Sequence, residues 1–125
     1  MRLALAAIAL AVCAAGCGSY DSSALDRSLP HYPGAQFVSR NSGCSSGPTG
    51  GRACSTETIW RMRRATAQPT VVTWFARRLD GWTYPTCGTS FTKGHAFVSI
   101  ATSGRTLSVY ADAHGADHCD DVPAG

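Results

Sequence analysis

The sequence predicts an α+β fold with two layers, in which an antiparallel sheet of about four strands carries one helix on one face, in the order ββαββ. Three observations lead to this prediction. Residues 55–66 alternate polar and apolar side chains, and so do two segments between residues 96 and 113, as half-buried strands do. Residues 69–80 repeat their apolar side chains with the period of an α-helix. The helical segment therefore separates two strand pairs.

The first predicted strand pair surrounds a glycine-rich segment. Residues 36–41 alternate weakly, and in residues 55–66 the side chains of Thr58 and Trp60 share one face. Residues 42–53 contain four glycines and one proline, so we expect a loop there.

The predicted helix has a defined start, stripe and end. Pro69 suits the first helical turn, and Gly81 suits the left-handed position after the last turn. Four apolar side chains form a stripe that should face the sheet: Val71, Val72, Phe75 and Leu79.

The last two strands form the clearest hairpin. Residues 96–102 and 106–113 both alternate, and Ser103-Gly104 between them is typical of a tight turn. We expect the helix to pack on the face that carries Val98, Ile100, Leu107 and Val109.

Residues 1–16 are typical of a secretory signal peptide, with a charged start at Arg2, an apolar run over residues 3–12 and small residues at its end. The run is shorter than the ~20 residues that span a bilayer. Ala14-Ala15-Gly16-Cys17 resembles the lipobox of bacterial lipoproteins. The resemblance implies that Cys17 is acylated and holds the protein at the extracytoplasmic face of the cell membrane.

The rest of the chain predicts one domain. Removal of residues 1–16 from the 125-residue chain leaves 109 residues, which suits a single domain. We expect residues 17–29 to comprise the lipidated cysteine and a flexible tether, because they are small and polar. Residues 30–125 then form the α+β domain with a polar C-terminal tail. The net charge of +3 is too small to indicate nucleic-acid binding.

Four cysteines follow Cys17, and in a small exported domain they predict two disulfides with three possible pairings. Cys44 and Cys54 flank the glycine-rich segment, which folds back easily, so we pair them with each other. This leaves Cys87 paired with Cys119.

Two short motifs lie on either side of the predicted strands and helix: Tyr32-Pro33-Gly34-Ala35 before the first strand, and Leu79-Asp80-Gly81-Trp82 at the end of the helix. This arrangement resembles a recurring small domain of exported bacterial lipoproteins over residues 30–113. The resemblance implies a two-layer fold and an exported location, and it implies no reaction and no ligand.

Three groups of residues invite a functional interpretation. Gly43-Cys44-Ser45-Ser46-Gly47 matches the string of a serine nucleophile elbow, which needs a strand before it and a helix after it. His114 and His118, beside several aspartates, are weak candidates for metal ligands. The third group is a basic surface that could meet anionic lipids or a polyanionic wall polymer: Arg61, Arg63, Arg64, Arg77 and Arg78.

Trp74 lies off the apolar stripe of the helix and is our candidate contact residue. We expect a cell-envelope lipoprotein that acts as a non-enzymatic binding module, with no cofactor. Its expected partners are the membrane, through the lipid anchor, and an envelope protein or wall polymer. Two alternatives stay open: a small enzyme or metal-binding protein that uses His114 and His118, and a purely structural envelope protein.

Overall fold

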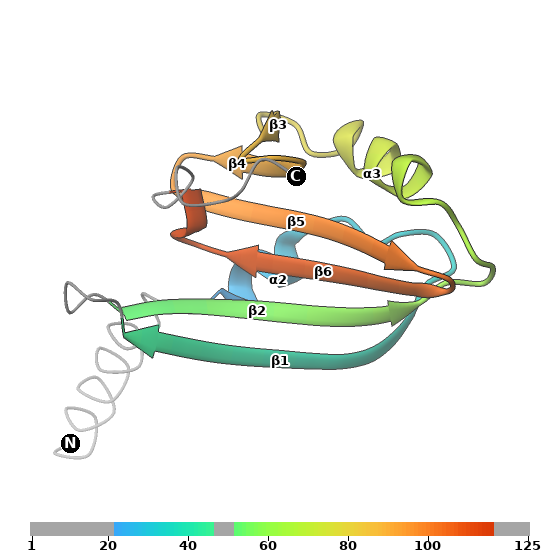
Figure 1. Cartoon of the computed structure of the whole chain (residues 1–125), viewed down its shortest axis with the longest axis horizontal. Helices are drawn as coiled ribbons and strands as arrows, with labels where there is room; N and C mark the ends of the chain where they lie inside the picture. The colour runs from blue at the N-terminus through green and yellow to red at the C-terminus, as the bar shows by residue number, and fades with distance from the viewer. Residues whose placement is uncertain (1–21, 47–51, 117–125) are drawn as a thin grey trace, which may run out of the picture.

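The computed structural model describes residues 22–46 and 52–116. The described part contains two helices and six strands (Figure 1), in the order α2 (Ser23–Ser28), β1 (Gln36–Ser46), β2 (Arg52–Arg61), α3 (Gln68–Ala76), β3 (Thr83–Thr86), β4 (Ser90–Lys93), β5 (Ala96–Ser103) and β6 (Thr106–Asp112).

All six strands belong to one antiparallel sheet with the order β1-β2-β6-β5-β4-β3. Chain neighbours pair as hairpins, except that β2 pairs with β6, the last strand. This pairing places Trp60 opposite Leu107 and Thr58 opposite Val109. It therefore joins the first hairpin to the rest of the sheet across almost half of the chain.

The predicted fold class is wrong. The described sheet has six strands rather than about four, and two short helices accompany it rather than one packed helix. The two strands that we missed, β3 and β4, have four residues each, too few to reveal an alternating pattern. β3 also contains Pro85, which a sheet tolerates at its edge because proline cannot donate a ladder hydrogen bond.

The predicted loop over residues 42–53 is also wrong in part, because β1 continues to Ser46 and β2 begins at Arg52. Glycine and serine carry no apolar pattern, so this part of the ladder left no signal in the sequence. Cys44 lies directly opposite Cys54 in the register, and the two form the predicted disulfide. Cys87 is also disulfide-bonded, but Cys119 lies outside the described residues, so that pairing stays a prediction.

The predicted apolar stripe of the helix is buried, as is the predicted face of the final hairpin. Leu79 follows α3 and belongs to the same core as the helix. The core includes the four stripe residues and the four strand residues, together with four others spread along the chain: Leu29, Met62, Val71, Val72, Phe75, Leu79, Phe91, Val98, Ile100, Leu107, Val109 and Ala111.

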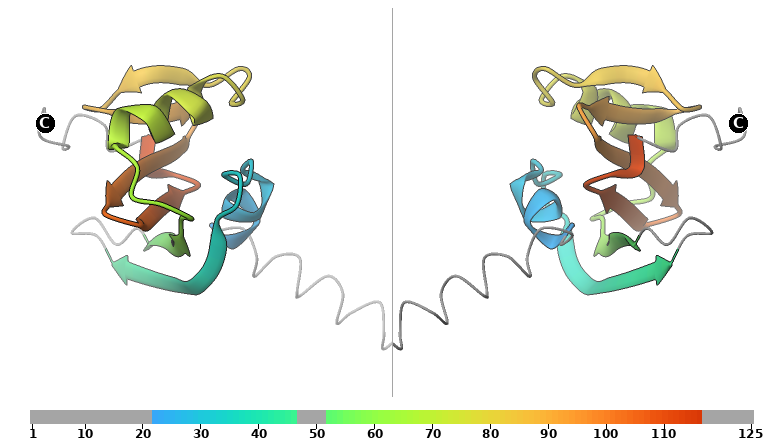
Figure 2. Two further views of the ribbon diagram at one scale, coloured as in Figure 1. Left: turned by 90° about the vertical axis from the view of Figure 1, so that its right-hand side faces the viewer. Right: turned by 90° about the vertical axis from the view of Figure 1, so that its left-hand side faces the viewer.

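Helix α2 lies where we expected a flexible tether. It packs on β2 and β6, and Figure 2 shows β1 bending around the side of the sheet on which α2 lies. Asp26 of this helix is buried, and its carboxylate accepts hydrogen bonds from Arg40 Nε at 2.9 Å and from Thr58 Oγ1 at 2.8 Å. The folded part therefore includes residues 22–29, before our predicted boundary at residue 30.

We predict that Phe75→Ala lowers the free energy of unfolding by about 3–5 kcal/mol, because the ring is 2 % exposed and its loss leaves a cavity under α3. The control Thr73→Ala, at an exposed position of the same helix, should change it by less than about 0.5 kcal/mol. Denaturant melts with the disulfides intact provide the comparison. Equal small losses would show that α3 does not cover the core.

We predict that Asp26→Asn lowers the free energy of unfolding by about 2–4 kcal/mol, because it leaves Arg40 facing a neutral group in a partly buried position. Asp80→Asn makes the same chemical change at an exposed residue and should cost less than about 0.5 kcal/mol. Thermal and denaturant melts measure both. A loss for Asp26→Asn as small as that for Asp80→Asn would contradict the role of this carboxylate.

Candidate functional site

The predicted serine elbow does not have the geometry that its chemistry needs. Ser45 lies within the edge strand β1, where it pairs with Ala53 of β2. A nucleophile elbow places the serine on a sharp turn between a strand and a helix. The backbone at Ser45 therefore gives no support to nucleophilic catalysis.

The predicted histidine pair is only partly within the described residues, since His118 lies outside them. His114 instead neighbours His95, with 6.2 Å between the ring centroids. Among residues 22–46 and 52–116, no group of three or more His, Cys, Asp or Glu side chains could hold a metal ion. The lipidation candidate Cys17 also lies outside the described residues and stays a prediction.

Trp74 borders a shallow groove of about 500 Å³ along α3. Its indole ring is held in place from several sides. The Tyr32 and Phe75 ring centroids lie 5.3 and 5.0 Å away, and the guanidinium of Arg78 lies over the ring at 4.2 Å from its centroid. We call this depression the Trp74 groove, and its lining is Tyr32, Pro69, Thr70, Thr73, Trp74 and Arg77.

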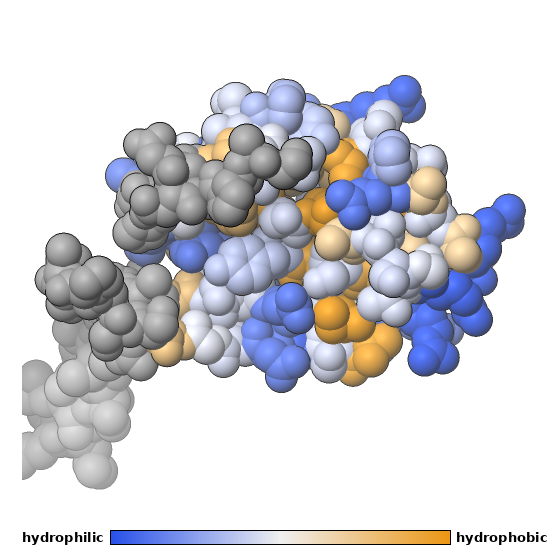
Figure 3. Space-filling model, in the orientation of Figure 1, coloured by the Kyte–Doolittle hydropathy of each residue, from blue (hydrophilic) through white to orange (hydrophobic). Residues whose placement is uncertain are grey.

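A second depression, of about 300 Å³, lies at the end of the sheet where β2 stops and the β5–β6 turn begins. Figure 3 shows hydrophilic side chains gathered at this end of the molecule. Three of its lining residues are arginines that no ion pair joins to a carboxylate within the described residues. We call it the arginine cleft, and its lining is Gly34, Ala35, Gln36, Arg61, Met62, Arg63 and Arg105.

A backbone hydrogen bond holds the guanidinium of Arg105, and the side chain of Arg63 lies against the glycine turn at residue 34. Arg105 Nε donates to the carbonyl oxygen of Met62 at 3.0 Å, and the Met62 amide donates to the Arg105 carbonyl at 2.7 Å. Gly34 has a positive φ of 75°, and a Cβ there would lie 2.5 Å from Arg63 Nε. The side chain of Arg63 can therefore lie across this turn only because position 34 is glycine.

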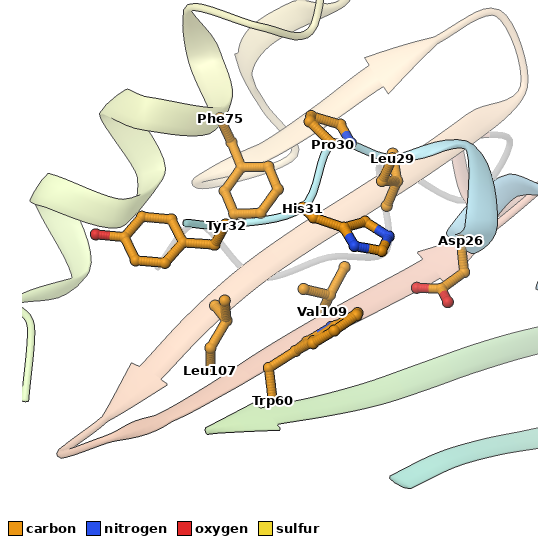
Figure 4. A pocket seen from close by; sticks show the side chains of 9 residues that line it. All are labelled: Asp26, Leu29, Pro30, His31, Tyr32, Trp60, Phe75, Leu107 and Val109. Atoms are coloured by element: carbon orange, nitrogen blue, oxygen red, sulfur yellow. The ribbon is translucent and has the colours of Figure 1, made fainter. Parts of the chain in front are cut away.

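The small cavity of Figure 4 lies between α3, the strands and the segment after α2. Phe75 points into it from α3, and His31 lies beside Trp60 with 5.0 Å between ring centroids. Its volume of about 10 Å³ is at the lower limit of what one water molecule needs. This cavity is therefore part of the packing and has no room for a ligand.

Sequence reasoning named Trp74, Arg61 and Arg63, and it missed Arg105 and Gly34 as parts of a site. Nothing in the sequence near Arg105 groups it with Arg61, because the two residues come together only through the pairing of β2 with β6. Gly34 was visible as part of the Tyr32–Ala35 motif, but its contact with Arg63 depends on the fold. Of the other three arginines of the predicted basic surface, Arg77 and Arg78 lie at the Trp74 groove. Arg64 is exposed and lines neither depression.

Comparison with known proteins finds no family model, no curated protein and no solved structure that matches this chain. Neither helix of the described part has the length and apolar character needed to cross a membrane.

Proposed function

We propose that this chain is a lipid-anchored, non-enzymatic binding module of the cell envelope, which presents its arginine cleft to an acidic ligand. The observation that carries the proposal is the position of the cleft. It lies at one end of β2 and β6, and the chain that follows Cys17 joins the folded part at the other end.

Ser22 is the residue at which the chain after Cys17 enters the folded part. Its hydroxyl donates to the carbonyl oxygen of Cys54 at 2.8 Å and accepts from the amide of Ala113 at 3.0 Å. Cys54 lies near the start of β2 and Ala113 directly follows β6. The first described residue, Ser22, is therefore fixed to β2 and to the residue after β6, at the end of these strands away from Arg61.

The lengths of the tether and of β2 set how far the cleft can lie from the lipid anchor. Four residues lie between Cys17 and Ser22, so the five extended Cα-to-Cα steps of this link reach at most roughly 18 Å. From Cys54 to Arg61 the strand advances seven residues, or about 24 Å. A lipid on Cys17 would therefore keep the Ser22 end within roughly 18 Å of the bilayer surface, and the arginines lie about 24 Å along β2 from that end. The cleft can then face away from the bilayer, beyond the screening length of ~10 Å.

The chemistry of the cleft suits an anion. Guanidinium groups bind carboxylate and phosphate through paired hydrogen bonds. Within the described residues the one ion pair is that of Arg40 with Asp26, outside the cleft. Arg61, Arg63 and Arg105 are all exposed. Apart from Arg105 Nε, which donates to Met62, their guanidinium donors can therefore reach a ligand.

We predict that the exported chain carries lipid on Cys17 and lacks residues 1–16, because residues 14–17 resemble a lipobox. Cys17→Ser should move the protein from the membrane fraction to the soluble fraction. Intact mass of the membrane-extracted protein tests the modification directly. Unchanged fractionation of Cys17→Ser, or an unmodified mature N-terminus, would contradict the lipid anchor.

We predict that the exported Cys17→Ser chain cosediments with insoluble cell-wall polymer and that added salt weakens this binding. Arg61→Gln/Arg63→Gln should lower the affinity roughly ten-fold or more, because two charged contacts are lost. The control Arg27→Gln/Lys93→Gln removes the same charge from exposed residues outside the cleft and should lower it about two-fold at most. Equal effects of the two pairs would point to non-specific charge attraction.

A second pair of variants tests the geometry of the cleft without changing its charge. Gly34→Ala and Gly94→Ala both place a side chain at positive φ, but only the first would meet Arg63. Binding should therefore fall for Gly34→Ala alone. If the Cys17→Ser chain with an unchanged cleft binds neither wall polymer nor any other acidic polymer, the purely structural alternative is favoured.

A further inference from the structure

The arginine cleft and the Trp74 groove border the same turn. Tyr32 lines the groove, and Gly34 and Ala35 line the cleft. The amide of Ala35 donates to the carbonyl oxygen of Tyr32 at 3.1 Å, which closes this turn. The two depressions are therefore neighbours on the surface, separated by the residues 32–35, although their other lining residues come from β2, α3 and the β5–β6 turn.

The two depressions offer different chemistry. The groove combines the aromatic side chains Tyr32 and Trp74 with the hydroxyl groups of Thr70 and Thr73. Aromatic rings present an apolar surface, and threonine hydroxyls both donate and accept hydrogen bonds. This combination suits a sugar ring, which has apolar C–H faces and peripheral hydroxyl groups.

The groove is also largely preformed. Contacts from Tyr32, Phe75 and Arg78 surround the indole of Trp74, and Phe75 is anchored in the core with 2 % of its surface exposed. A ligand in the groove would not have to order these rings, so little of its binding free energy would be lost to conformational entropy.

We infer that the two depressions bind one chain molecule, a glycan that carries phosphate or carboxylate groups. Its sugar units lie in the Trp74 groove and its acidic groups lie in the arginine cleft, on either side of the turn at residues 32–35. The inference rests on the proposed function and specifies its ligand class. A polyanion without sugars would use the cleft alone, and a neutral glycan would use the groove alone.

Linking two weak contacts in one molecule makes the second contact intramolecular, which raises the overall affinity strongly. The ligand that carries both groups should therefore bind more tightly than either partial ligand. Calorimetric titration of the exported Cys17→Ser chain with three probes tests this: phosphorylated dextran, unmodified dextran, and inorganic polyphosphate of matched phosphate content. Phosphorylated dextran should bind at least about ten-fold more tightly than polyphosphate.

Variants separate the two contributions. Thr70→Ala/Thr73→Ala should lower the affinity for phosphorylated dextran roughly ten-fold, because two hydrogen bonds are lost. The affinity for polyphosphate should stay unchanged. Trp74→Ala should act in the same direction. The control Thr83→Ala/Thr89→Ala, at exposed threonines outside both depressions, should affect neither probe.

Two results would overturn the inference. The first is equal affinity for polyphosphate and phosphorylated dextran, with no effect of the groove variants. The arginine cleft would then be a site for anions in general, and the ligand would not be a glycan. The second is binding to vesicles of phosphatidylglycerol that is as tight as binding to phosphorylated dextran, again with no effect of the groove variants. The ligand of this surface would then be an anionic lipid. If the Cys17→Ser chain binds none of the acidic probes, the proposed function itself is refuted.

Discussion

The carboxylate of Asp26 is buried between α2 and the strands, where it receives hydrogen bonds from Arg40 and Thr58. Arg40 is on β1 and Thr58 is on β2, so one side chain joins a helix to two strands. A buried carboxylate without such partners would be strongly unfavourable. The position of α2 on the sheet is therefore specified by these polar contacts together with the packing of Leu25 against the core.

The segment after α2 depends on this attachment. Leu29 enters the core directly behind the helix, and the chain then passes Trp60 and α3 before it turns at residues 32–35. This turn contributes one wall to the Trp74 groove and another to the arginine cleft. The attachment of α2 at one end of the sheet thus helps to form the surface at the other end.

The two ends of the paired strands β2 and β6 differ in chemistry. At one end Ser22 joins β2 to the residue after β6 with neutral hydrogen bonds. At the other end Arg61 and Arg105 meet because those strands are antiparallel neighbours. A rigid pair of strands therefore separates the place where the chain joins the folded part from the place where cationic groups collect, which is a suitable arrangement for a tethered binding module.

Local patterns in the sequence were enough to determine the apolar stripe of α3, the β5–β6 hairpin and the Cys44–Cys54 disulfide. Each depends on neighbours within about ten residues, where periodicity and turn chemistry act directly. Only the tertiary structure decided the six-stranded sheet, the helix α2 and the arginine cleft. Four-residue strands and a six-residue polar helix have little stability of their own, and they form because distant residues supply their hydrogen bonds and their core. Arg105 and Gly34 could not be assigned to a site from the sequence for the same reason. Arg105 comes beside Arg61 only after β2 has paired with β6, and Gly34 comes beside Arg63 only after β1 has paired with β2.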